Sequence, residues 1–152
     1  MNSDKQIASI NQLSNDMDEI YHEIAQHFEL TDNIYWIFYI LHDNEKPVTQ
    51  SDLSRKWAFS KKTVNSSIAT MIKSDWITLE LLPNSRKLKA INLTTSGDQL
   101  CQRVGNLTHQ IEHLAYSELN DDEFVKFLKL FERLNINFRK AADELLTKDD
   151  SD

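Results

Sequence analysis

Apolar residues recur with a helical period over most of the chain. From Asp4 to Phe28 they lie three, four or seven positions apart with polar residues between them, which predicts a long amphipathic helix. Residues 32–43 are apolar almost all round. We therefore expect a second, buried helix there, with Thr31 as its N-cap.

Two shorter helical patterns follow. Thr49 and Asp52 carry a capping-box signal for a third helix, with Leu53 and Trp57 one turn apart on its inner side. Ser60 is the expected N-cap of a fourth helix. Its predicted inward stripe comprises Val64, Ile68, Met71 and Ile72.

A hairpin and two long helices complete the pattern. Residues 76–94 read as two strands around a turn that carries Arg86 and Lys87 at its tip. A fifth helix begins at Thr94, and its inward positions are Leu100, Cys101, Val104, Leu107, Ile111 and Leu114. Asn120 caps a sixth helix, which carries more apolar residues than one neighbouring helix could cover. The first and last helices are therefore expected to form an interface between subunits.

Charge is distributed unevenly along this pattern. The 152 residues have a net charge of −7, which by itself argues against a nucleic-acid partner. Between Thr49 and Asn92, however, eight basic residues stand against three acidic ones, a net charge of +5 that leaves −12 for the flanks. Lys61 and Lys62 occupy the first turn of the fourth helix, where the helix dipole disfavours positive charge unless an anion is near. This asymmetry indicates a centre that binds a polyanion.

Several other classes of protein are disfavoured by what the sequence lacks. It has no apolar run of about 20 residues and no signal pattern at its start, so we expect a cytoplasmic protein without a membrane partner. Its one cysteine, Cys101, lies on an apolar stripe and is expected to be a small buried hydrophobe rather than a redox sensor. Glycine-rich phosphate loops and nucleophile elbows are missing, so we expect no enzyme.

Helix, turn, helix and a hairpin with a basic tip, flanked by long helices, resemble the multiple-antibiotic-resistance regulator (MarR) family of transcription factors. The resemblance is carried, in this order, by VTQSDLSRKWAFSKKTVNSSIATMIKSDWI, LPNSRKLKAINLTTSGDQL and ELNDDEFVKFLKLFERL. It implies a mainly α fold: a winged helix-turn-helix with a small two-stranded β-wing, plus long N- and C-terminal dimerisation helices. The expected organisation is a dimerisation region at 1–30 and 115–148, a DNA-binding lobe with a connecting helix at 31–114, and a disordered tail at 149–152.

The resemblance also implies a function, that of a homodimeric repressor which binds an inverted-repeat operator in double-stranded DNA and is modulated by a small effector. Lys61 and Lys62 would face phosphates, while Thr63, Asn65 and Ser66 of the same helix would read bases. All expected DNA-binding residues are Ser60, Lys61, Lys62, Thr63, Asn65, Ser66, Lys73, Arg86 and Lys87.

Two positions depart from the family pattern. The wing carries Ser85-Arg86-Lys87, or Asn84-Ser85-Arg86 in a slipped register, where an Asp-x-Arg pattern is usual. Asp75 stands where a glycine usually closes the recognition helix, and aspartate tolerates that left-handed position at some energetic cost.

The nature of the effector is left open by the sequence. Trp36, Phe38 and Tyr39 could line an effector pocket, as the resemblance implies, or they could be plain core of the second helix. No cofactor is required by this function.

A metal site is a separate alternative. His109 and His113 lie one turn apart and could share a zinc ion, with His42 and Glu112 as further ligands. Some relatives in the family are zinc-dependent repressors with histidines near these places. The other reading is a solvated or hydrogen-bonded histidine pair.

A rival from another class is a winged-helix module that binds a protein and no DNA. It agrees with the overall acidity of the chain. The outer face of the fourth helix, which is small, polar and basic, argues against it.

Overall fold

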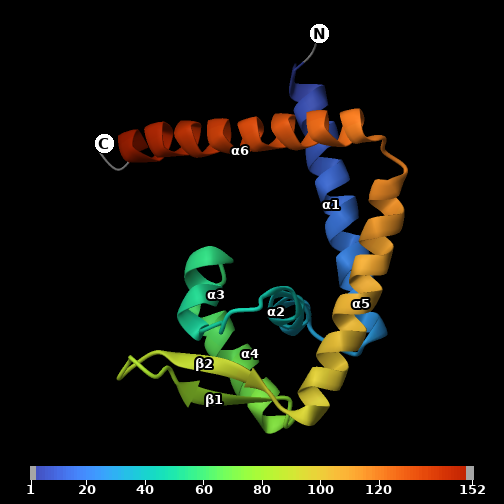
Figure 1. Cartoon of the computed structure of the whole chain (residues 1–152). Coiled ribbons are helices and arrows are strands. Elements are labelled where there is room, and N and C mark those ends of the chain that lie inside the picture. The colour runs from blue at the N-terminus through green and yellow to red at the C-terminus, as the bar shows by residue number, and fades with distance from the viewer. Residues whose placement is uncertain (1–2, 150–152) are drawn as a thin grey trace. The chain divides into compact units, whose positions relative to one another are not determined.

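The computed structural model describes residues 3–149, which form six helices and one β-hairpin. By internal contacts the chain divides into two compact units, one that ends at His109 and one that begins at Gln110. The order of elements is the one expected from the sequence, and the mainly α fold with a two-stranded wing is confirmed (Figure 1).

The first unit contains four complete helices, the hairpin and the first part of a fifth helix. These elements are α1 (Ser3–His27), α2 (Asp32–Asp43), α3 (Gln50–Lys56), α4 (Lys61–Lys73), β1 (Ile77–Leu81), β2 (Lys89–Leu93) and α5 (Thr95–Ser117). Helix α2 packs against α1 and α4, and α4 also packs against α3 and β1.

The core of this unit is built around α2, as its apolar sequence predicts. Five of its residues are buried: Ile34, Tyr35, Ile37, Phe38 and Ile40. Leu53 of α3, Val64 and Met71 of α4 and Val104 of α5 join them in the core. The polar group of Tyr35 is satisfied inside the core, because its hydroxyl lies 3.0 Å from that of Thr108.

The hairpin is tied to the start of α3. Strands β1 and β2 pair antiparallel, with Ile77 opposite Leu93 and Leu81 opposite Lys89. The backbone N–H of Ile91 donates to the carbonyl of Val48 at 2.8 Å, next to an isolated bridge between Thr49 and Ala90. The wing and the helix-turn-helix therefore share backbone hydrogen bonds.

Three predicted inward positions are wrong. Trp57 and Ile72 are each 45% exposed, and Leu114 is 72% exposed. Trp57 is the C-cap of α3 and its backbone is no longer helical. Helical spacing therefore does not direct its side chain inward. Ile72 lies at the edge of its stripe, where an apolar residue can fall outside the packed side of its helix. Leu114 belongs to the second unit, beyond the part of α5 that joins the core of the first unit.

The second unit contains the rest of α5 and helix α6 (Asp121–Asp149). Asn120 and Glu123 cap α6 reciprocally: the backbone N–H of each donates to the other's side chain at 3.0 Å. Large apolar side chains of α6 are exposed on the single chain: Phe124, Val125, Phe127, Leu128, Leu130, Phe131, Leu134, Ile136, Phe138, Leu145 and Leu146. The predicted tail lies outside the described residues, apart from Asp149, the last residue of α6.

No helix within residues 3–149 combines the length and the apolar character needed to span a membrane.

Candidate nucleic-acid interface

Helix α4 begins with a cap that sets the position of its two lysines. The hydroxyl of Ser60 accepts from the backbone N–H of Thr63 at 3.0 Å and donates to the Thr63 hydroxyl at 2.8 Å. The first turn of α4 contains no acidic residue, and both Lys61 and Lys62 are exposed there. Positive side chains thus stand where the helix already carries unsatisfied N–H groups, which makes this end attractive to an anion.

The outer face of α4 is small and polar. Asn65, Ser66, Ala69 and Thr70 are all exposed. The Ser66 hydroxyl donates to the carbonyl of Thr63 and the Thr70 hydroxyl to the carbonyl of Ser66, each at 3.0 Å. Short side chains held against their own helix let its backbone approach a surface closely.

The charges on this face are not neutralised from within the chain. Among residues 3–149, none of Lys61, Lys62 and Lys73 takes part in a salt bridge. Arg55 and Lys56 differ from them, because both reach Asp52, at 3.2 and 3.5 Å. Three lysines of α4 are therefore available to a partner.

The tip of the wing is organised by Ser85. Its hydroxyl accepts from the backbone N–H groups of Lys87 and Leu88, at 3.2 and 2.8 Å. A serine thus closes the turn where an aspartate is usual in the family pattern, in the manner of a side-chain-capped turn. Arg86 and Lys87 are exposed at this tip, as the sequence predicts.

The end of α4 is fastened to the start of α5. Asp75 has a left-handed backbone with φ of 56°, as expected for a residue in the place of a helix-closing glycine. Its carbonyl accepts from the hydroxyls of both Thr94 and Ser96 at 2.6 Å. At Gly97 an added Cβ would lie 1.8 Å from the carbonyl oxygen of Trp76, so only glycine fits that close contact.

Two hollows flank the first turn of α3. One, of about 220 Å³, lies between α3 and α4 and is lined by Gln50, Ser51, Ser54, Lys61, Val64 and Asn65. The other, of about 340 Å³, lies between α3 and the wing and is lined by Thr49, Gln50, Ser51, Leu79, Lys87, Leu88 and Lys89. Side chains from three separate sequence segments thus meet around Gln50.

The three candidate effector residues have different surroundings. Phe38 is fully buried and packs edge-on against Trp76, with ring centroids 5.6 Å apart. Tyr39 is half-buried beside His109. Trp36 lines an almost wholly apolar hollow of about 170 Å³ together with Ile40, Trp57 and Phe59.

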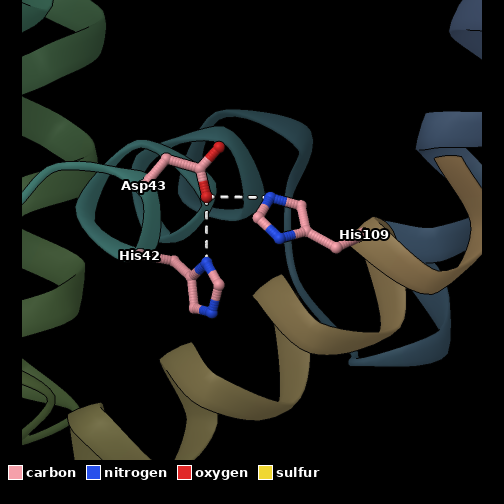
Figure 2. A group of neighbouring side chains, drawn as sticks. All are labelled: His42, Asp43 and His109. Carbon is pink, nitrogen blue, oxygen red and sulfur yellow. Dashed lines mark hydrogen bonds and ion pairs between the residues drawn. The ribbon is translucent and has the colours of Figure 1, made fainter. Parts of the chain in front are cut away.

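A histidine–carboxylate cluster lies between α2 and α5 (Figure 2). The Nδ1 atom of His42 and the Nε2 atom of His109 each lie 2.9 Å from the same oxygen of Asp43. One ligand atom from each residue lies within 4.8 Å of the others. His113 and Glu112, which the sequence also offered, belong to the second unit.

A missing side chain on α5 makes room for this cluster. A Cβ at Gly105 would lie 2.2 Å from Cγ of His42, so the imidazole occupies the space of the absent side chain. The two rings meet edge to face with centroids 4.9 Å apart. Glycine at 105 thus allows His42 to lie flat against α5.

Sequence reasoning missed three residues of these sites. Asp43 directly follows His42, and this adjacency was a usable signal for the cluster. Gln50 and Phe59 carry no comparable signal, because their roles depend on the packing of α3 against α4 and α2.

Comparisons with known proteins give matches of structure alone. No family model and no curated sequence matches the chain. A MarR family regulator from Neisseria meningitidis is similar with a TM-score of 0.76 and 21% identity, over 95% of this chain and 99% of that one. MepR of S. aureus in complex with DNA gives 0.70 and 17%, over 86% and 96%. A MarR family transcriptional regulator from Listeria monocytogenes complexed with 26mer DNA gives 0.71 and 16%, over 89% of each chain.

The chain therefore has the winged helix-turn-helix fold of the MarR family of transcription regulators. The proteins from Neisseria meningitidis and Listeria monocytogenes are MarR family regulators, and the S. aureus protein is bound to DNA in its structure. Since each sequence identity is below 25%, the comparisons establish the fold alone. The chemistry of the site is argued from this chain's own residues.

Proposed function

We propose that this protein is a sequence-specific DNA-binding transcriptional regulator, without enzymatic activity of its own. One observation carries the proposal: the outer face of α4 offers unneutralised lysines and short polar side chains in a chain that is otherwise acidic. Lysines and a helix N-terminus bind phosphates, while Asn65 and Ser66 are the right types and length to reach base edges. Arg86 and Lys87 of the wing would add contacts in the neighbouring groove.

The active form in this proposal is a homodimer. The exposed apolar residues of α6, and Ile7, Ile10, Leu13, Met17 and Ile20 of α1, are more than a soluble monomer normally leaves uncovered. A two-fold dimer presents two copies of α4. Its operator would then be an inverted repeat with half-sites about one helical turn, or about 10 base pairs, apart.

The regulator would act as a repressor that a small effector modulates. A dimer bound at an operator can repress by occluding the promoter. The hollow bordered by Trp36, Trp57 and Phe59 supports an apolar, aromatic effector, because its lining is almost free of polar groups.

The test is a binding isotherm on selected DNA sites at several salt concentrations. Log affinity should fall with log salt by several units. Lys62→Ala should weaken binding to all sequences alike and reduce the slope by about one. Ser66→Ala and Asn65→Ala should instead relax preference at particular bases, by about 1 to 3 kcal/mol each. Lys140→Ala, on the exposed surface of α6, is the matched charge control.

One result would favour the rival from another class. If neither Lys62→Ala nor Ser66→Ala alters the isotherm on the best site, α4 is not the element that binds DNA. A winged-helix module that binds a protein would then be the better description.

A second candidate function, a zinc-responsive repressor of the same fold, is favoured by the His42–Asp43–His109 cluster. Two imidazoles and a carboxylate suit zinc, and three protein ligands leave a fourth position open. These residues would hold the ion between the end of α2 and α5, and the ion would cross-link the two helices.

Zinc binding can be measured without any DNA. Purified protein should retain about one zinc per subunit, and its melting temperature should rise with zinc. His109→Ala removes a ligand, and Gly105→Ala displaces the His42 ring without removing one, so both variants should lose the metal. His27→Ala, an exposed histidine of α1, should keep it. A metal-free protein whose melting ignores both zinc and chelator would contradict this candidate.

A further inference from the structure

The amide of Asn65 is engaged on one side only. Gln50 Nε2 donates to Asn65 Oδ1 at 3.4 Å across the boundary between α3 and α4. A free asparagine can present its oxygen and its NH₂ group together, which is the combination that pairs with adenine in the major groove. This hydrogen bond turns the Asn65 oxygen toward α3, so the group that Asn65 presents to a base is the NH₂ donor.

The backbone position of Gln50 is fixed by the start of α3. Gln50 is half-buried and is the first residue of α3, whose start is fixed by the reciprocal cap of Thr49 and Asp52. Beneath it, Leu53 and Val64 are buried where α3 packs on α4. The backbone of Gln50 is therefore fixed relative to that of Asn65 by two packed helices rather than by a loop.

The side chain next to Asn65 in this hollow also offers only hydrogen-bond donors. Lys61 lies one turn before Asn65 and lines the same hollow with Gln50. A lysine ammonium has only donors. This side of α4 therefore offers donors to DNA, and the base edge with two adjacent acceptors, O6 and N7, is that of guanine.

From this geometry we propose that Gln50 is a specificity-determining positioning residue: by holding the oxygen of Asn65, it makes α4 read guanine in preference to adenine at one position of each half-site. The proposal rests on the proposed DNA-binding function and deepens it. Gln50 needs no contact with a base of its own.

The test compares base preference rather than affinity. The preferred site is first selected from random duplexes. The position read by Asn65 is the one at which Asn65→Ala loses its base preference. Affinities are then measured for sites with guanine or adenine at that position. The unmodified protein should favour guanine by roughly tenfold or more. Gln50→Met keeps the volume of the side chain and removes the donor to Asn65, so the ratio of the affinities for the guanine and adenine sites should fall toward one.

Gln50→Glu should reverse the preference. A carboxylate at this position accepts from the Asn65 NH₂ group and leaves the Asn65 oxygen to face the DNA, which favours the amino group of adenine. The added negative charge weakens binding to both sites alike, so the ratio still reports the orientation. In an Asn65→Ala background, neither Gln50 variant should change the ratio.

A chemical probe and a control complete the design. Replacing guanine with 7-deazaguanine removes the N7 acceptor and should weaken the unmodified protein but not Gln50→Met. Gln102→Met makes the same change at an exposed glutamine of α5 and should leave every ratio unchanged. Melting curves of each variant show that it is folded.

The failures of the two proposals can be told apart. No sequence preference for any duplex would overturn the DNA-reading function and this inference with it. A selected site on which both Gln50 variants keep the parental guanine-to-adenine ratio would overturn the inference alone.

Discussion

Within residues 3–149, three residues other than glycine adopt a left-handed backbone, each just after a helix: Glu29, Ala58 and Asp75, with φ of 56°, 57° and 56°. Glycine is the usual residue at such positions, since a Cβ is strained there. The chain has only two glycines, and both occupy places where a Cβ would collide with a neighbour. Each of these helix ends therefore carries some backbone strain.

Replacing Ala58 by glycine should relieve that strain in the turn between α3 and α4. We expect the free energy of unfolding to rise by about 1 kcal/mol, measured by urea denaturation. Ala69→Gly, at an exposed position inside α4, should lower it by about 1 kcal/mol. Equal changes in both variants would show that the left-handed conformation is not the cause.

The thiol of Cys101 should be unreactive in the folded protein. Burial raises its pKa to about 12, and the negative charges of Asp98 and Asp43 add to the shift. At pH 8 almost no thiolate forms, so iodoacetamide should label the protein only after unfolding. Rapid labelling of the folded protein at pH 8 would contradict the structure.

At the scale of the elements, the start of α3 depends on a titrating cap. Partial burial would raise the pKa of Asp52, but hydrogen bonds from Thr49 and the charge of Lys56 outweigh it and hold the pKa below the ordinary aspartate value of 3.8. Because the folded pKa is depressed, the stabilisation is complete above pH 3.8 and is lost as the pH falls below that value.

Asp52→Ala should therefore cost about 1 kcal/mol at pH 7 and progressively less under acid conditions. Parallel denaturation curves of variant and parent, from pH 7 down to the lowest pH at which the parent stays folded, measure the difference. Ser51→Ala should show neither the loss nor the pH dependence. A constant difference at every pH would rule out the carboxylate as the source.

The contact between α5 and the end of α4 is a second determinant at this scale. Gly97→Ala should destabilise the protein by about 2 to 3 kcal/mol, because the new Cβ meets backbone that cannot rotate away. Gly105→Ala should cost less, since the group in its way is the movable ring of His42. Thermal melting of the two variants measures which of them is destabilised more.

Local signals in the sequence were sufficient for the element boundaries. The caps at Thr49, Ser60 and Asn120 are confirmed because each depends on residues no more than three positions apart. Thr31 takes the N-cap position of α2 without a side-chain cap bond, so there the position is right and the expected contact is absent.

Contacts between distant segments could not be predicted in the same way. The hydrogen bond from Gln50 to Asn65 and the approach of Asp43 to His109 depend on how helices pack, which a periodic pattern does not specify. The exposure of Trp57 shows the same limit. The prediction that Trp57 points inward assumes that α3 continues to this residue, but α3 ends at Lys56.

At the scale of the whole molecule, the prediction concerns the assembly of two chains into a dimer. Phe131 of α6 is 52% exposed and stacks on Phe127, with centroids 5.8 Å apart. Phe131→Asp should place a charge in the proposed dimer interface and yield monomers or insoluble chains, as sedimentation would show. Glu132→Lys, which changes charge at an exposed neighbour, is the control. If the unmodified protein is a folded monomer at micromolar concentration, the dimer proposal is wrong.

The two hydroxyls that meet on the Asp75 carbonyl have a mechanical consequence. They join Asp75, which follows the C-cap of α4, to Thr94 and Ser96 at the start of α5 by short hydrogen bonds. We therefore expect a rotation of the first turns of α5 to move the end of α4 with it. The direction of α4 can then change without any contact to the side chains of its outer face.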